Sequence, residues 1–138
     1  MKITARLENS VDAHVLSVAT NGAQRTLGVL PKPTGRGSSV SGGELLLAAL
    51  ATCVCNDLFR EAAKRGLTVD DVAVEAEADF PAEGAPAESV RYRVRISGPG
   101  DAAALRELVR HTDAVAEIQN TVRSAIPVKL EHVEVSGG

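Results

Sequence analysis

The sequence predicts an α+β fold. Residues 2–8, 13–20 and 89–97 alternate between polar and apolar side chains, which is typical of strands with one buried face. Residues 43–64 instead form one long helical stretch whose first half is apolar. The expected order is strands, long helix, strands, two helices and a strand, which is an α+β arrangement. We expect a single domain over residues 1–138, a length that suits one hydrophobic core.

The composition is that of an ordinary soluble protein, with 44% hydrophobic and 24% charged residues. Aromatic residues make up only 2%, so small aliphatic side chains must build the core, and a homodimer would bury further surface. A net charge of −3 and scattered basic residues argue against nucleic-acid binding. The longest apolar run, residues 45–51, is too short to span a bilayer, and the N-terminus has no signal-peptide pattern. We therefore expect a cytoplasmic protein with reduced thiols and no membrane association.

The first third of the chain predicts a strand hairpin followed by a loop. Asn21-Gly22 between two alternating stretches is a strong hairpin signal, and residues 24–30 are expected to form the returning strand. Residues 31–39 are rich in proline, glycine and serine, a composition typical of loops.

The long helix has a predicted start, a predicted end and two different halves. Ser41 with Glu44 three residues later has capping-box spacing, and Gly66 after two cations favours a helix end. Residues 45–54 are apolar all round, so we expect them to be buried between a sheet and another layer or subunit. Residues 56–65 carry five charged side chains and are expected to reach solvent.

The second half of the chain predicts a hairpin, a helix pair and a last strand. The expected segments are strands 68–79 and 89–97, a helix over 101–111, a second helix starting at Thr112 or Asp113, and a strand over 128–135. Arg91, Arg93 and Arg95 share one face of their strand. Such a row is either a binding surface or, more often, the solvated side of an antiparallel sheet.

Both cysteines, Cys53 and Cys55, lie on the long helix. Two residues turn a helix through about 200°, so the two side chains leave on nearly opposite faces and an intrahelical disulfide is not expected. The histidines, His14, His111 and His132, are distant in sequence and do not give metal-ligand spacing. We expect no bound metal and no cofactor.

Cys53 lies in the middle of the predicted helix among apolar residues, and these surroundings would raise its pKa. Thiolate formation needs a nearby cation, for which Arg6, Arg25 and Arg36 are candidates upstream of the helix. Glu44 precedes Cys53 by nine residues and lies about 180° around the helix from it. It would orient an arginine, contribute to a site completed by a partner helix, or serve only in the capping box.

Two segments resemble the OsmC/Ohr family of osmotically inducible protein C-like and organic hydroperoxide resistance proteins. The first is Gly42–Cys53, with the sequence GGELLLAALATC, and the second is Ala116–Val122, with the sequence AEIQNTV. The resemblance covers nearly the whole chain. It implies an intertwined α+β homodimer with long central buried helices and antiparallel sheets packed around them.

The resemblance also implies an activity and exposes a departure from it. Active members are thiol peroxidases that reduce organic hydroperoxides and are recycled by dithiols. Their peroxidatic cysteine matches Cys53, their helix glutamate matches Glu44, and their activating arginine corresponds to Arg25 or Arg36. Ala116 stands where the family has its resolving cysteine. A two-cysteine cycle between these positions is therefore impossible.

Two hypotheses about function follow from the sequence. In the first, the Cys53 thiolate attacks an organic hydroperoxide and becomes a sulfenic acid, and an external thiol completes the cycle. In the second, the protein is not an enzyme and binds a small hydrophobic ligand at the dimer interface, with Cys53 and Cys55 as packing residues.

Overall fold

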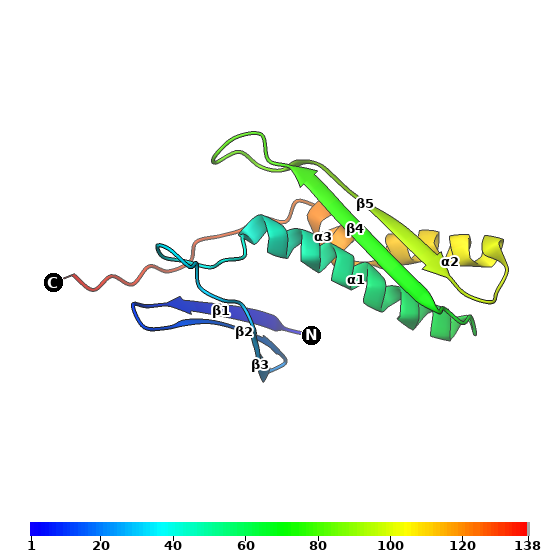
Figure 1. Cartoon of the computed structure of the whole chain (residues 1–138), viewed down its shortest axis with the longest axis horizontal. Coiled ribbons are helices and arrows are strands. Elements are labelled where there is room, and N and C mark those ends of the chain that lie inside the picture. The colour runs from blue at the N-terminus through cyan, green and yellow to red at the C-terminus, as the bar shows by residue number, and fades with distance from the viewer. Residues whose placement is uncertain (138) are drawn as a thin grey trace. The chain divides into compact units, whose positions relative to one another are not determined.

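The computed structural model describes residues 1–137 and confirms an α+β fold with one long helix and antiparallel sheets (Figure 1). The chain forms two compact units, Met1–Leu46 and Leu47–Gly138. Gly138, the last residue of the predicted single domain, lies outside the described residues, and a single domain stays a prediction. The elements are β1 (Ile3–Asn9), β2 (His14–Thr20), β3 (Ala23–Leu27), α1 (Gly42–Lys64), β4 (Asp71–Asp79), β5 (Glu88–Ser97), α2 (Ala102–Val115) and α3 (Glu117–Arg123).

The first unit contains the three-stranded antiparallel sheet β1-β2-β3. The predicted hairpin is confirmed, because Asn21 and Gly22 adopt positive φ angles of 48° and 85° and Thr20 pairs with Ala23 across the turn. Positive φ at both turn residues gives the twist that two-residue hairpins need. The returning strand ends at Leu27, earlier than predicted.

Helix α1 begins and ends where the sequence predicts. The Ser41 amide donates to Glu44 Oε1 at 2.9 Å, and the Glu44 amide donates to Ser41 Oγ at 3.0 Å, which completes a capping box. At the other end Gly66 adopts a φ of +64°, and the Leu67 amide donates to the Ala62 carbonyl at 2.9 Å. This geometry satisfies a terminal helix carbonyl and favours glycine at the left-handed position.

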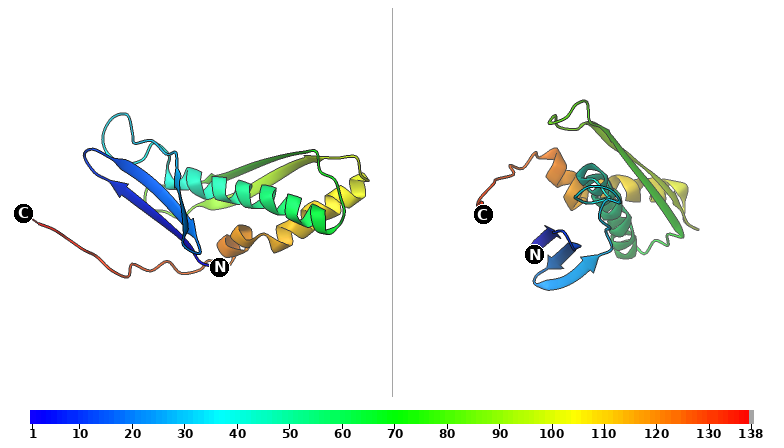
Figure 2. Two further views of the ribbon diagram at one scale, coloured as in Figure 1. Left: turned by 90° about the horizontal axis from the view of Figure 1, so that it is seen from below. Right: turned by 60° about the vertical axis from the view of Figure 1, so that its left-hand side comes forward.

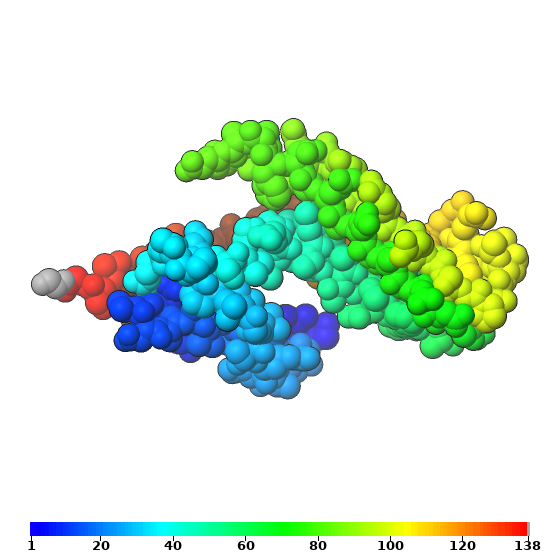
Figure 3. All heavy atoms as spheres, in the orientation of Figure 1, coloured from blue at the N-terminus to red at the C-terminus, as the bar shows by residue number. Residues whose placement is uncertain are grey.

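The second unit contains the antiparallel hairpin β4–β5. Glu75 pairs with Arg93 and Glu77 with Arg91 in the strand register, so acidic and basic side chains face each other across the sheet. Arg93 lies 2.9 Å from Glu77, and Arg91 lies 3.1 Å from the same carboxylate. Most of the arginine row is thus the solvated, ion-paired face of a sheet. The hairpin is the green-to-yellow ridge in Figure 3.

The core of the second unit joins α1, α2 and the inner face of the hairpin. In the left-hand view of Figure 2, α3 and α2 follow one another along α1. Apolar side chains of β4 and β5, including Val72 and Val94, pack against the core cluster. The buried members of that cluster are Val54, Leu58, Ala62, Leu108 and Ala116.

The burial of α1 differs from the prediction in both halves. Leu45 and Leu46 are each 36% exposed, so the apolar half is not buried on every side. In the charged half, Asp57 and Glu61 are buried at 6% and 5% exposure, because ion-pair partners let their carboxylates leave water. The prediction that this half reaches solvent holds for the face with Arg60 and was wrong for the buried carboxylates.

By length and composition alone, α1 could cross a membrane, because its charged residues are concentrated near one end. The sequence predicted no membrane-spanning segment, because that prediction counted only the uninterrupted apolar run of residues 45–51. The side chains of Val54 and Leu58 are fully buried in a core shared with α2 and the hairpin.

The C-terminal third contains two corrections. Helix α2 continues to Val115, whereas a break was predicted at Thr112 or Asp113. Thr112 does not cap a new helix, because its hydroxyl donates to the Leu108 carbonyl at 2.8 Å inside α2. The predicted strand over residues 128–135 is also absent from the described residues. A strand requires a hydrogen-bonded neighbour, and this segment is exposed without one.

Candidate functional site

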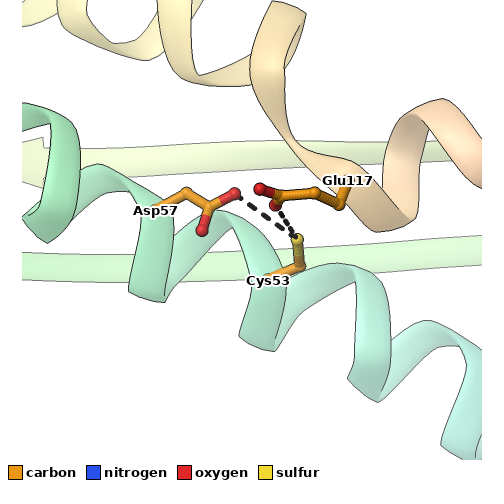
Figure 4. A group of neighbouring side chains, drawn as sticks. All are labelled: Cys53, Asp57 and Glu117. Carbon is orange, nitrogen blue, oxygen red and sulfur yellow. Dashed lines mark hydrogen bonds between the residues drawn. The ribbon is translucent and has the colours of Figure 1, made fainter. Parts of the chain in front are cut away.

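Cys53 lies beside two carboxylates in the second unit. Its Sγ is 3.6 Å from Asp57 Oδ2 and 3.9 Å from Glu117 Oε2, and the thiol can donate a hydrogen bond to either (Figure 4). Cys53 and Asp57 are four residues apart on α1 and therefore share one helix face. Ala116, between α2 and α3, has extended backbone angles, and Glu117 follows it as the first residue of α3. The interruption of helical structure at Ala116 thus brings Glu117 to the thiol.

The cation of this cluster is Arg60. Its guanidinium lies 3.0 Å from Asp57 Oδ1 and 3.3 Å from Glu117 Oε1. It also donates to Glu61 Oε1 at 2.8 Å. Among the residues that the structure describes, the side chains hydrogen-bonded to Cys53 Sγ are the carboxylates, while Arg60 binds those carboxylates instead of the sulfur.

These surroundings favour the neutral thiol. Burial is the main effect and raises the pKa of Cys53. A hydrogen bond with the Ile118 backbone opposes it, and the negative charges of Asp57 and Glu117 raise the pKa further. Burial, followed by the neighbouring Glu117 carboxylate, also raises the pKa of Asp57. Asp57 is therefore a better proton acceptor than an ordinary aspartate, while the sulfur it faces is a weaker acid than an ordinary thiol.

Glu61 connects the cluster to the end of α1 and to α2. Its Oε1 accepts from Lys64 at 2.9 Å, and its Oε2 lies 3.1 Å from His111 Nε2. Hydrogen bonds from Lys64 and Arg60 lower the pKa of Glu61 to about 2. The buried Glu61 carboxylate thus binds side chains of both α1 and α2.

Replacing this carboxylate is expected to lower thermal stability. The folded pKa of Glu61 lies below its ordinary value of 4.5, so its contribution is complete above about pH 4.5 and is lost as pH falls toward 2. Glu61→Gln should lower the Tm by several degrees at pH 7, and the difference from the natural chain should shrink at pH 2–3. Thermal unfolding followed by circular dichroism measures both. Glu107→Gln is the matched control, because Glu107 is exposed and its ion pair with Arg110 is long, at 4.0 Å. Equal effects of the two variants would contradict a stabilising role of Glu61.

The structure places the predicted site residues in different settings. Glu44 is exposed in the first unit, and hydrogen bonds from Ser41 lower its pKa. Arg25 is exposed on β3, and Arg36 donates to Asn9 Oδ1 at 2.9 Å. The capping role of Glu44 is therefore present, while its role toward Cys53 and that of either arginine stay predictions.

The other sulfur and the histidines add little to the cluster. Cys55 is partly buried and, like Cys53, is a free cysteine, as expected for two side chains on different helix faces. His14 Nδ1 lies 3.0 Å from Asn9 Nδ2, whereas His132 is exposed. Of the three histidines, His111 alone joins the polar network, through Glu61.

The carboxylates around Cys53 were not predicted from the sequence. Asp57 carried a usable signal, because it is four residues after Cys53 on a predicted helix. Glu117 carried no such signal, because its contact with Cys53 depends on the residue at which α2 ends and α3 begins. Cys53, Asp57 and Glu117 place three donor atoms within 4.8 Å of one another, and a thiolate with two carboxylates suits zinc. Arg60 already binds both carboxylates, so their charge is partly neutralised without an ion.

Comparison with known proteins places this chain in a family. The family described as "OsmC-like protein" matches residues 35–131, which is more than two thirds of the chain. The chain belongs to the OsmC-like protein family. No curated protein sequence matches it.

Solved structures agree with the family assignment. The OsmC-like protein of Mycoplasma pneumoniae is 20% identical with a TM-score of 0.63, covering 90% of this chain and 87% of that one. An organic hydroperoxide resistance protein OsmC of Legionella pneumophila is 20% identical with a TM-score of 0.55, covering 89% and 90%. The organic hydroperoxide resistance protein OhrB of Bacillus subtilis is 21% identical with a TM-score of 0.53, covering 94% and 95%. At these identities, the similarity establishes an OsmC-like fold.

Proposed function

We propose that this OsmC-like protein is a one-cysteine thiol peroxidase that reduces organic hydroperoxides through Cys53. The observation that carries the proposal is the position of Cys53, a partly exposed free thiol whose Sγ faces the proton-accepting carboxylate of Asp57. The hydroperoxide resistance relatives named above support the substrate class. As the resemblance implies, Glu44 and either Arg25 or Arg36 would orient and tune the reacting sulfur.

The chemical step transfers one oxygen atom to sulfur. The thiol proton moves from Sγ to Asp57, and the thiolate attacks the outer peroxide oxygen. The O–O bond breaks, an S–O bond forms, and the departing alkoxide takes a proton to leave as an alcohol. Sulfur is oxidised to a sulfenic acid while the hydroperoxide is reduced. Because the raised pKa of Cys53 leaves little thiolate at neutral pH, we expect the rate to increase as pH rises.

The recovery of the thiol needs an external thiol. Ala116, at the position that the resemblance gives to the resolving cysteine, is fully buried and has no sulfur. One external thiol would condense with the sulfenic acid to form a mixed disulfide and water. A second would release Cys53 as a thiol and leave as the external disulfide. A reducing cytoplasm would supply such thiols.

The first test is the trapping of the sulfenic acid. Reduced protein treated with one equivalent of cumene hydroperoxide and dimedone is expected to carry the adduct at Cys53, located by mass spectrometry of peptides. The Cys55→Ser variant should give the same adduct, and Cys53→Ser should give none. An unmodified Cys53 in folded protein would refute the peroxidase proposal.

We also propose that the protein is a homodimer. Apolar side chains that are exposed in the described chain support this, because a second subunit would cover them. They include Leu45 and Leu46 on α1, and Leu130 and Val135 near the C-terminus. Light scattering after size-exclusion chromatography is expected to give twice the 14.4 kDa mass of one chain. A mass of one chain at micromolar concentration would contradict the proposal.

A second candidate function is non-catalytic binding of a small hydrophobic ligand. It is favoured by a cavity of about 410 Å³ whose lining includes Leu50, Val90, Val122 and the buried Gln119. The raised pKa of Cys53 is also compatible with a thiol that only packs. Under this alternative, dimedone would find no sulfenic acid, and an apolar ligand would bind equally well to the Cys53→Ser variant.

A further inference from the structure

A groove between β5 and α2 combines an apolar floor with a row of cations. Its volume is about 470 Å³. The apolar lining comes from both elements and consists of Val94, Ile96, Ala102, Leu105 and Val109. The cationic lining consists of Arg95, Arg106 and Arg110. No acidic side chain lines the groove among the described residues.

The strand register explains why Arg95 has its charge available. Arg91 and Arg93 face Glu77 and Glu75 across the hairpin and are held in ion pairs. Arg95 faces Ala73 at the next position on the same face, so the acidic row is interrupted beside the groove. Within residues 1–137, Arg95 makes no ion pair.

The other two arginines come from one face of α2. Arg106 and Arg110 are four residues apart and therefore lie on the same face of α2, about one helical turn from each other. Arg110 lies 4.0 Å from Glu107, the longest ion pair in the described part of the chain, and both side chains are largely exposed. Arg106, like Arg95, has no ion pair among the described residues. The three guanidinium groups are thus weakly neutralised in a protein whose net charge is −3.

We propose that this groove binds a free long-chain carboxylate, with its head group on the arginines and its hydrocarbon chain on the apolar floor. Guanidinium groups match the planar geometry of a carboxylate, and the aliphatic floor favours burial of a hydrocarbon chain. The combination favours an amphipathic anion over a neutral apolar molecule or an inorganic anion. This site is separate in its residues from the Cys53 cluster and does not depend on the proposed peroxidase activity.

The test compares dodecanoate, below its micelle concentration, with dodecanol by isothermal titration calorimetry. We expect dodecanoate to bind more tightly, and the difference to shrink at high salt. The Arg106→Gln/Arg110→Gln double variant should weaken dodecanoate binding about tenfold, from about threefold for each exposed guanidinium, with little effect on dodecanol. These substitutions are on the exposed face of α2, so folding should be retained.

The matched control is Arg91→Gln/Arg93→Gln, which removes the same charge from arginines already paired with acids. It should change the dodecanoate Kd less than twofold. Equal losses in the two double variants, equal affinity for dodecanol and dodecanoate, or no dodecanoate binding would each overturn the proposal. Cosedimentation with phosphatidylglycerol vesicles that depends on Arg106 and Arg110 would assign the groove to lipid head groups and would also overturn it.

Discussion

Leu58→Ala is expected to lower the free energy of unfolding by about 3 kcal/mol, within the usual range of about 2–5 kcal/mol for a buried leucine. Leu58 is fully buried in the C-terminal half of α1. It belongs to the cluster that joins α1 to Leu108 of α2 and to the apolar side chains of β4 and β5. The loss combines the transfer of apolar atoms with the cavity left behind. Because few aromatic side chains are available to fill such a cavity, little compensation is expected.

Urea unfolding at one fixed protein concentration measures this loss, since a dimer would make stability depend on concentration. Leu130→Ala is the matched control. Leu130 is 85% exposed, so the same substitution should change the free energy by less than about 0.5 kcal/mol in a single chain. If Leu58→Ala also costs less than about 0.5 kcal/mol, α1 is not the centre of the core. A larger cost at Leu130 alone would show that a partner covers the C-terminal segment.

The parts of the fold that local chemistry determines were predictable. Asn21-Gly22 specified the hairpin because both residues tolerate positive φ. Ser41 and Glu44 specified the start of α1 because the two side chains satisfy each other's backbone amides. In both cases the decisive contacts lie within four residues, and the sequence displays them directly.

The parts that depend on distant contacts were not predictable. Thr112 has the residue type of a helix cap, but its place in the core turns its hydroxyl back to Leu108. The segment over 128–135 has the alternation of a strand, but a strand also requires a neighbour that alternation cannot supply. The burial of Asp57 and Glu61 likewise depends on cations that their positions along the chain do not reveal.

Cys53 was singled out by the resemblance and by its place on α1, and its role in the chemistry stays a prediction. The structure places its sulfur beside polar groups. Its carboxylate neighbours were not found, because Glu117 reaches it across a gap of 64 residues. These carboxylates change the expected chemistry. They add to the effect of burial, which already raises the pKa of Cys53, and they put a proton acceptor beside the sulfur, whereas the sequence predicted only an apolar setting in need of a cation.

The second large effect is expected from returning a sulfur to position 116. In a Cys55→Ser background, Ala116→Cys should form a disulfide with Cys53 after one equivalent of cumene hydroperoxide. Residue 116 directly precedes Glu117, whose carboxylate is 3.9 Å from Cys53 Sγ. It also belongs to the cluster against which Cys53 packs. A sulfenic acid at Cys53 would therefore meet a thiol before it meets dimedone.

Thiol titration and peptide mass spectrometry distinguish the outcomes. The Ala116→Cys variant should lose two thiols per chain, give a peptide linking residues 53 and 116, and show little dimedone adduct. Cys55→Ser/Ala114→Cys is the matched control, because Ala114 is exposed near the end of α2 and its thiol should leave the adduct intact. Alanine to cysteine at a fully buried position adds one sulfur atom, so circular dichroism should first establish that the variant is folded. A folded variant that keeps its dimedone adduct would show that residue 116 is not placed to resolve Cys53. A disulfide would show that this chain retains the geometry of a two-cysteine cycle and lacks only the second sulfur.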